Sequence, residues 1–481
     1  MENADAIEPR FGASGGGSQG DCQGSLASYV QDNVNRDAIT AELRKQMDPE
    51  AFHKVAILPL PKHVSDIHEH GLLYLPFPYV VPGGRFNEMY GWDSYFIQLG
   101  LLRDGEIELA KDMAGNLLYE VREYGQVLNA NRTYYLTRSQ PPFLTEMVLG
   151  VYRRTKDRAW LADALPALES YYQFWVREPH LTPATGLSRY YDLGDGPAPE
   201  VLAAEPTYYD TARDYFRTHT IRDYDASQFY DHAKNQLTPL FYQGDRSMRE
   251  SGFDTSNRFG PFNVDIIHYD PVCLNSRLYL MEVQLAEISD ILGHSAKAES
   301  WRVRGRERAE KINRYMWDAK DGLYYDVNFT TGRVRRYPFL TTFYPLWAGI
   351  ATAEQAGRVA ANLSKFEKPG GLQTSTVDSG DQWDAPFGWA PLQWIAVEGL
   401  RRYGFRNDAD RISLAFLSLV QQEYRKSGNI DEKYDVVRRA SKLDGEIHYG
   451  YSTNEAGFGW TNAVYAMLYD QLDAASQRKL Q

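Results

Sequence analysis

Two acidic residues in separate loops are the first candidates for chemistry in this chain. Asp254 follows a Ser-Gly-Phe triplet in RESGFDTSNRFG, and an acid held against an aromatic ring can have the raised pKa of a general acid. Glu432 lies in IDEKYDVV, close to Tyr434 and Asp435. Carboxyl groups from separate loops that meet in an aromatic cleft are suited to cleaving a glycosidic bond. One protonates the departing oxygen, and the other activates water or attacks the anomeric carbon.

Both acids also have structural interpretations that the sequence leaves open. Asp254 could cap the segment that follows it, and Glu432 could pair with Lys433 or Arg438 on a solvated face. Chemistry is favoured because acids, amides, arginines and aromatic residues recur together in several other loops. These loops are PGGRFNEMYGWDSYF from Pro82, NANRTYYLTRSQPPF from Asn129, SGDQWDAPFGWAP from Ser379 and GEIHYGYSTNEAGFGWTN from Gly445.

The side chains of these loops suit the recognition of a sugar. Amides and arginines offer fixed donors and acceptors to several hydroxyl groups at once. The 34 Tyr and 10 Trp bring the aromatic content to 14%, which suits stacking on flat or ring-shaped ligands. Trp383 and Trp389 could equally belong to the hydrophobic core, and the sequence does not separate the two possibilities.

The overall composition argues against several other classes of protein. The net charge of −12 and the lack of a long Lys/Arg run disfavour a nucleic-acid partner. No apolar run approaches the roughly 18 residues of a membrane helix, and the N-terminus lacks the basic start and apolar core of a secretory signal. We therefore expect a soluble, cytoplasmic protein with a small-molecule substrate and no membrane partner. The sequence does not indicate an oligomeric state.

Cysteine and histidine usage indicates neither a disulfide framework nor a metal site. Cys22 lies in a Gly/Ser-rich head and Cys273 at the start of an apolar helix, which is typical of a small buried hydrophobe. The ten histidines show no HExxH motif or paired-ligand spacing. We expect no metal and no cofactor.

Helical periodicity dominates the rest of the chain. In LNSRLYLMEVQLAEISDILG, apolar residues recur every three or four positions from Leu274 to Leu292, and Gly293 ends the run. A second helix is expected in the segment from Trp160 to Trp175, where Pro166 suggests a later start. About a dozen such stretches lie between Ser28 and Gln471. Since no fixed repeat supports a solenoid, we expect a closed toroid of helix pairs. Residues 1–24 are predicted to be a flexible N-terminal segment, and residues 25–481 a single all-α catalytic domain.

The aromatic loops resemble the signature motifs of the trehalase family, glycoside hydrolase family 37. PGGRFNEMYGWDSYF is similar to its first signature and QWDAPFGWAP to its second, while Asn129–Pro142, EKYD and GFGWTN follow in the family's order. The resemblance spans about residues 75 to 470. It implies an (α/α)6 barrel with long catalytic loops, inversion at the anomeric carbon and no metal.

The same resemblance implies a role for individual residues. It places the general acid at Asp254 and the catalytic base at Glu432, with Trp383 as an aromatic wall. It assigns substrate contacts to Arg85, Trp92, Asp93, Asn129, Arg138, Ser139, Gln140, Glu200 and Gly252.

Three departures from the family pattern lie on the leaving-group side. The family's Arg-Pro-Glu segment reads Ala198-Pro199-Glu200, and Phe253 replaces a tryptophan before the acid. The glycine-rich lid is replaced by VVRRASKLDGEIHYGYSTNE, so the family's late binding glutamate could be Glu446 or Glu455. Cations of this segment could face an anionic leaving group; they are Arg438, Arg439 and Lys442.

The resemblance predicts an inverting hydrolase of a small α-glucoside, with trehalose as the first substrate. The altered residues keep a second substrate class open, namely glucosylglycerate or mannosylglycerate. A catalytically silent sugar-binding protein is the rival from another class. The presence of both Asp254 and Glu432 argues against it, because such a protein is expected to have lost an acid.

Overall fold

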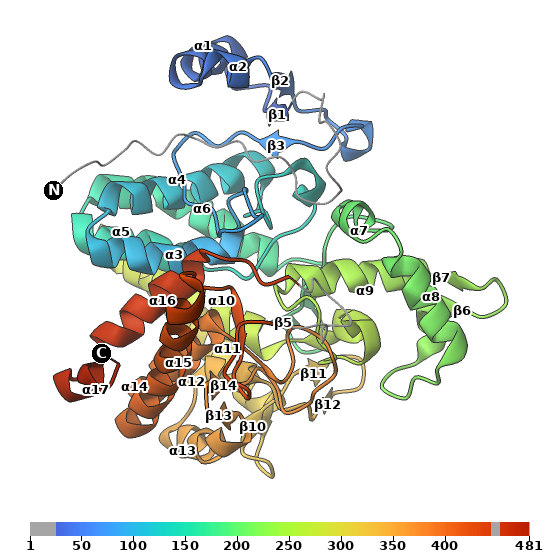
Figure 1. The fold of residues 1–481 in the computed structure, drawn as a ribbon, viewed down its shortest axis with the longest axis vertical. Helices are drawn as coiled ribbons and strands as arrows, with labels where there is room; N and C mark the ends of the chain where they lie inside the picture. The colour runs from blue at the N-terminus through green and yellow to red at the C-terminus, as the bar shows by residue number, and fades with distance from the viewer. Residues whose placement is uncertain (1–25, 444–452, 481) are drawn as a thin grey trace.

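Six helices form a closed inner ring in the computed structural model, which describes residues 26–443 and 453–480 (Figure 1). Around the ring α3 packs on α5, α5 on α10, α10 on α12, α12 on α14 and α14 on α16, and α16 returns to α3. The ring helices are α3 (Gly91–Asp104), α5 (Leu144–Thr155), α10 (Val272–Leu292), α12 (Tyr344–Ala348), α14 (Ala390–Arg402) and α16 (Gly459–Asp470).

A second layer of helices alternates with the ring along the chain. These are α4 (Ile107–Tyr124), α6 (Arg158–Trp175), α11 (Ser295–Tyr315), α13 (Ala353–Ala361) and α15 (Arg406–Ser427). Helices α4, α6, α11 and α15 pack on the ring from outside. This inner–outer alternation is the (α/α)6 barrel, so the predicted fold class is confirmed. Among the described residues, none of the helices has the length and apolarity needed to cross a bilayer.

The helix predicted from Leu274 shows how the apolar pattern builds the barrel. Its residues Leu274, Leu278, Met281, Leu285 and Ile288 are all buried, because α10 contacts α5, α6, α11 and α12 on different sides. Gly293 ends the helix in the left-handed conformation, with a φ of 86°.

The predicted late start of the helix near Trp160 is wrong. Helix α6 begins at Arg158, and the side chain of Asp157 caps it by accepting a hydrogen bond from the Trp160 amide at 3.0 Å. Pro166 therefore lies inside the helix. The cap and the burial of Leu161 and Leu168 fix the first turns in spite of the proline.

A small parallel sheet precedes the barrel, where the sequence suggested only helices. Strand β1 (Leu26–Val30) pairs with β2 (Val55–Pro59) and with β3 (Leu72–Leu73), and Ser28 faces Ile57 and Leu72 in the register. Helices α1 (Arg36–Gln46) and α2 (Pro49–Phe52) connect the first two strands. The sheet packs through Tyr29 and Leu73 on Leu128 of the barrel.

The remaining elements lie in the connections, which carry the site. An excursion between the barrel helices contains α7 (Pro199–Ala204), α8 (Tyr208–Thr218) and α9 (Pro239–Glu250). Helix α17 (Ala474–Arg478) follows α16. The 3₁₀ segments are η1 (Val64–Asp66), η2 (Thr133–Tyr135), η3 (Ala226–Gln228), the longer, kinked η4 (Pro261–His268), η5 (Leu340–Phe343) and η6 (Leu363–Lys365). The strands are β4 (Leu181–Thr182), β5 (Leu187–Ser188), β6 (Tyr230–Asp231), β7 (Gln236–Leu237), β8 (Tyr269–Asp270), β9 (Trp317–Asp318), β10 (Leu323–Tyr324), β11 (Val327–Asn328), β12 (Arg333–Val334), β13 (Glu367–Lys368), β14 (Gly371–Leu372), β15 (Phe387–Trp389) and β16 (Lys433–Asp435).

Candidate active site

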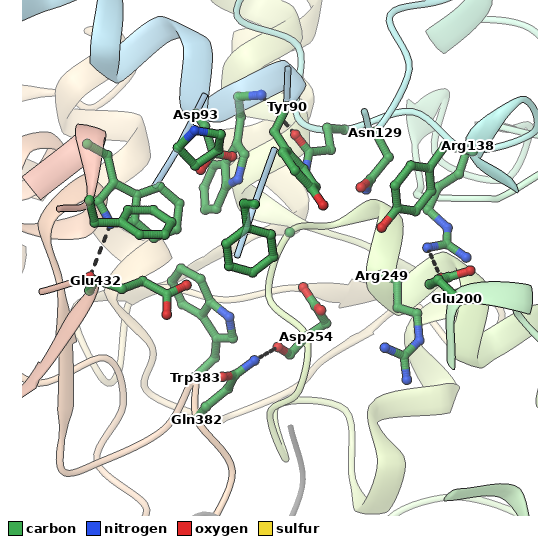
Figure 2. Close-up of a pocket in the computed structure, with 18 residues that line it drawn as sticks. Tyr90, Asp93, Asn129, Arg138, Glu200, Arg249, Asp254, Gln382, Trp383 and Glu432 are labelled. Atoms are coloured by element: carbon green, nitrogen blue, oxygen red, sulfur yellow. Dashed lines mark hydrogen bonds and ion pairs between the residues drawn. The ribbon is translucent and has the colours of Figure 1, made fainter. Parts of the chain in front are cut away.

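One cavity at an end of the barrel collects most of the residues that the sequence singled out (Figure 2). It is formed by the first turn of α3, the start of α16, the end of α9 and the loops between them. The carboxyl groups of Asp254 and Glu432 are both directed into it. The lining residues predicted from the sequence are Trp92, Asp93, Asn129, Arg138, Gln140, Glu200, Gly252, Asp254, Trp383 and Glu432.

The loop that carries Asp254 is held in place by its backbone. Gly252 has a φ of 75°, and a Cβ there would meet the Trp92 ring at 3.2 Å, so only glycine fits this approach. The side-chain amide of Gln382 donates to the carbonyl of Asp254, and the Trp383 amide donates to the next carbonyl, that of Thr255, at 3.0 Å. The following 3₁₀ helix has Gly260 at its N-cap, so the interpretation of Asp254 as a cap is wrong.

The carboxyl group of Asp254 is buried, and burial changes its pKa in the direction that a general acid needs. Loss of hydration raises the pKa of its carboxyl to about 6. The positive charges of Arg249 and Arg138 oppose this rise in pKa, and the negative charge of Glu200 supports it. A carboxyl group with a pKa near 6 is protonated for part of the time at neutral pH and can donate its proton to a leaving group.

Glu432 immediately precedes β16, which pairs with β15 beside the cavity. Its amide donates to the carbonyl of Glu455 at 2.9 Å, and its own carbonyl accepts from the indole of Trp460 at 3.1 Å. The Lys433 ammonium donates to its carboxylate at 3.2 Å. The predicted alternative of a pair with Lys433 is correct in its partners, but the pair is buried, since neither side chain is more than 1% exposed.

Aromatic rings form the wall between the two acids. Trp383 and Trp389 stack with centroids 3.8 Å apart and planes at 7°. Trp92 contacts Phe253, Trp383 and Trp460 at centroid distances of 5.7–5.8 Å. Trp389 is fully buried and supports Trp383, which lines the cavity. One ring of the pair is therefore core and the other is wall.

An ion-paired cluster forms the side of the cavity near Asp254. Arg138 donates through Nε to Asp192 at 2.8 Å and pairs through Nη1 with Glu200. Arg249 is fixed by Asp245, with Nη2 donating at 3.2 Å. Among the described residues, Nη2 of Arg138 and Oε2 of Glu200 are buried without a hydrogen-bond partner. A bound molecule with hydroxyl groups could satisfy both.

Polar side chains from α3 and from the loop that begins at Asn129 form another part of the cavity wall. The Trp92 amide donates to the side chain of Gln140 at 2.9 Å, which orients the first turn of α3. Asp93 lies in that turn, and burial raises the pKa of its carboxyl well above the usual value, with further contributions from Glu432 and Asp254. Asn129 lines the cavity beside these residues.

Of the predicted contact residues that the structure describes, Arg85, Ser139 and Glu455 do not line the cavity. Arg85 is bound to Glu455, whose carboxylate accepts from the Arg85 amide at 3.0 Å and lies 3.5 Å from its Nε. Ser139 is buried and donates to the carbonyl of Val127 at 2.6 Å, so it supports the loop from below. Glu446 lies outside the described residues.

The cations proposed for an anionic leaving group point elsewhere. The guanidinium of Arg439 donates to the carbonyl of Pro369 at 2.6 Å and packs along α15. Arg438 is exposed and lies 3.8 Å from Asp435, and Lys442 is exposed as well. None of these three residues lines the cavity, because the chain turns at Arg439 with a φ of 57° and returns to Asp435.

The structure adds lining residues that sequence reasoning passed over. Arg249 matters most, because it brings a guanidinium into the cavity near Glu200, while Ala198 is fully buried. Arg249 lies in the last turn of α9, only five residues before Asp254, and this proximity in the sequence could have pointed to it as a lining residue. The other additions are Pro82, Phe86, Tyr90, Tyr135, Gln382, Phe458 and Trp460. Among the described residues, no group of three His, Cys, Asp or Glu is arranged to hold a metal ion.

Comparison with known proteins identifies the family of the chain that forms this cavity. Residues 23–473 match the trehalase family profile. This chain belongs to the trehalase family. It is 38% identical over 507 residues to the cytosolic neutral trehalase of Saccharomyces cerevisiae, covering 96% of this chain and 66% of that protein. This member of the family thus spans slightly less than two thirds of the length of that curated relative.

Two solved structures place this trehalase-family chain among known folds. The neutral trehalase of Saccharomyces cerevisiae superposes with a TM-score of 0.79 at 33% identity, covering 95% of this chain and 88% of that one. A mannosylglycerate hydrolase of Thermus thermophilus in complex with glucose gives a TM-score of 0.55 at 19% identity, covering 82% and 96%. The second likeness shows the shared fold alone.

Proposed function

We propose that this trehalase-family protein hydrolyses trehalose to two glucose molecules with inversion at the anomeric carbon. The observation that carries the proposal is the pair of buried carboxyl groups in one aromatic cavity, each with a different charged neighbour. The relatives named trehalases support the choice of substrate. The cytosolic name of the yeast relative supports the same location for this chain.

In this mechanism Asp254 is the general acid. It donates its proton to the glycosidic oxygen as the bond to the first glucose breaks, which suits a carboxyl whose pKa is raised to about 6. Glu432 is the general base and takes a proton from the attacking water. The ammonium of Lys433 favours its ionised form, and the indole of Trp460 fixes its backbone.

The remaining lining residues orient the two rings. Trp383 offers its face to the first glucose, while Asp93, Asn129 and Gln140 supply hydrogen-bonding groups around it. Arg138 and Glu200 have unsatisfied atoms that suit the hydroxyl groups of the second glucose. Arg249 lies beside them and takes over the task of the arginine that the family has at position 198.

The reaction is tested by incubating the protein with trehalose, kojibiose, sucrose, glucosylglycerate and mannosylglycerate and following the products by proton NMR. Trehalose should be cleaved with the highest kcat/KM, and the first turnover should release one β- and one α-glucose, because only the attacked carbon inverts. Initial release of α-glucose alone would exclude inversion, which requires carboxyl groups roughly 6.5–9.5 Å apart. Cleavage of a glycerate glucoside instead would reassign the substrate, and no cleavage of any compound would favour the silent sugar-binding protein.

A further inference from the structure

A second cavity lies at the far end of α16, whose first turn lines the catalytic cavity, and of its neighbour α14. Its volume is about 490 Å³, and its walls include Trp347, Glu398, Arg401, Arg402, Arg406 and Gln471. Glu398, Arg401 and Arg402 belong to the last turns of α14, and Gln471 follows the last residue of α16. Trp460 at the start of α16 lines the catalytic cavity, and Trp389, the N-cap of α14, stacks on Trp383 of its wall. At roughly 1.5 Å per residue, the helices separate the two cavities by about 20 Å.

The second cavity is cationic in a protein that is acidic overall. The chain carries a net charge of −12, yet three arginines line this one hollow. Arg401 pairs with Asp410 at 2.6 Å. Within the part of the chain that the structure describes, neither Arg402 nor Arg406 forms an ion pair. Two guanidinium groups are thus left to attract an anion, and the carboxyl group of Glu398 lies near enough to Arg402 for their charges to interact.

A helix end adds to this positive potential. Arg406 is the first residue of α15, a helix of 22 residues whose N-cap, Phe405, provides no side-chain hydrogen bond. The first amide groups of such a helix carry a partial positive charge that favours anions. Asp408 in the same turn is occupied by Arg411, which donates to it at 2.7 Å.

The other walls of the cavity suit hydroxyl groups and a flat or ring-shaped surface. Gln471 donates to Glu398 at 2.8 Å, so the two side chains present a joined pair of polar groups. Among the described residues, Oε1 of Gln471 and Nε of Arg401 are buried without a hydrogen-bond partner. The indole of Trp347 completes the wall. The volume exceeds what an inorganic anion needs.

We propose that this cavity binds a small phosphorylated sugar or polyol. Arg402 and Arg406 hold the phosphate, whose charge and geometry match guanidinium groups. Glu398 and Gln471 bind the hydroxyl groups of the remainder, which packs against Trp347. The site is separate from the catalytic cavity and does not depend on the substrate proposed above.

The test is calorimetric titration of the purified protein with glucose 6-phosphate, with inorganic phosphate and with glucose. We expect saturable binding of one glucose 6-phosphate per chain, with inorganic phosphate binding at least about tenfold more weakly because it lacks the hydroxyl contacts. The double variant Arg402→Ala/Arg406→Ala should bind glucose 6-phosphate at least about tenfold more weakly. The matched control Arg304→Ala removes an exposed arginine on α11 and should bind as the wild type does.

A second variant separates the two halves of the site. Gln471→Leu should weaken the binding of glucose 6-phosphate but leave the affinity for inorganic phosphate unchanged. This variant tests the site even if the double variant unfolds. Absence of glucose 6-phosphate binding at millimolar concentration would overturn the proposal. So would binding that persists in the double variant, because a ligand in the catalytic cavity would not respond to arginines about 20 Å away. Equal affinity for inorganic phosphate would overturn the assignment of a sugar or polyol.

Discussion

The two sides of the catalytic cavity hold their carboxyl groups in opposite ways. Asp254 lies on a loop fixed through its backbone, and its side chain faces an arginine and a glutamate whose effects on its pKa oppose each other. Glu432 adjoins a strand and its carboxylate touches the ammonium of its own neighbour. The difference teaches how two buried acids acquire different tasks, because burial without a contacting cation favours the protonated form and a contacting cation favours the ionised form.

The largest effect should come from separating the two roles chemically. Asp254→Asn and Glu432→Gln should each lower kcat for trehalose by about 10²–10⁴-fold. With α-glucosyl fluoride, whose leaving group departs without a proton, Asp254→Asn should keep most of its activity while Glu432→Gln stays inactive. Initial rates for both substrates measure this, with Asp210→Asn on the surface as control. Equal losses on the fluoride would contradict the assignment of acid and base.

On the side of Glu432, removing the neighbouring positive charge should strongly lower the stability of the fold. Lys433→Met leaves the buried carboxylate of Glu432 without its ammonium and should lower the free energy of unfolding by about 3–5 kcal/mol. Lys426→Met removes a lysine that is 62% exposed and paired with Glu423, and should cost about 1 kcal/mol or less. Urea titrations compare the two. Adding Glu432→Gln to Lys433→Met should recover part of the loss, and similar effects of both lysines would show that the buried pair is not special.

The acid side should instead gain stability when its charge is removed. The carboxyl of Asp254 has a pKa of about 6 in the folded protein, above the ordinary 3.8, so the folded state loses stability as the pH rises from about 4 to about 6. Asp254→Asn lacks this penalty and should be more stable than the wild type by roughly 1–3 kcal/mol at pH 7, but not at pH 4. Thermal unfolding at both values measures it. A variant that is equally stable at pH 7 would show that the pKa is not raised.

The smallest effects concern the neighbours that adjust Asp254. Burial raises its pKa most, Arg249 lowers it and Glu200 raises it. Arg249→Met should therefore move the alkaline limb of kcat/KM to higher pH, and Glu200→Gln should move it to lower pH. Both variants should also lose about tenfold in kcat/KM through a missing hydrogen bond. Shifts of the limb in the same direction would mean that it reports another group.

The helices of the barrel could be predicted from the sequence alone, because the apolar periodicity of each helix lies within one continuous segment. The apolar positions of α10 repeat every three or four residues, and the same face is buried. The sheet of β1, β2 and β3 could not be predicted in this way. Its strands are five residues or shorter and pair in parallel across distant parts of the chain, and such short apolar runs do not distinguish a strand from a helix.

In the candidate site, too, some residues could be predicted from local sequence motifs and others depend on the three-dimensional fold. Residues in long motifs, such as Trp92, Asp93 and Trp383, line the cavity as predicted, although their roles stay predictions. Ser139 belongs to the same kind of motif but supports the loop from below, since only the fold decides which way a side chain points. Arg249 was missed and Arg439 was misplaced, because one depends on the direction of the last turn of α9 and the other on a left-handed turn.

The contact between α3 and α16 that closes the ring has a consequence for how the protein is made. Trp92 and Trp460 touch across this seam, and Arg103 pairs with Asp470 at its far end at 2.6 Å. During synthesis the N-terminal partner emerges several hundred residues before the C-terminal one. The early helices must therefore wait with an apolar flank uncovered until the last helix leaves the ribosome. Catalytic competence and ring closure are then a single late event, and a chain that stops before α16 should be a client for chaperones rather than a weak enzyme.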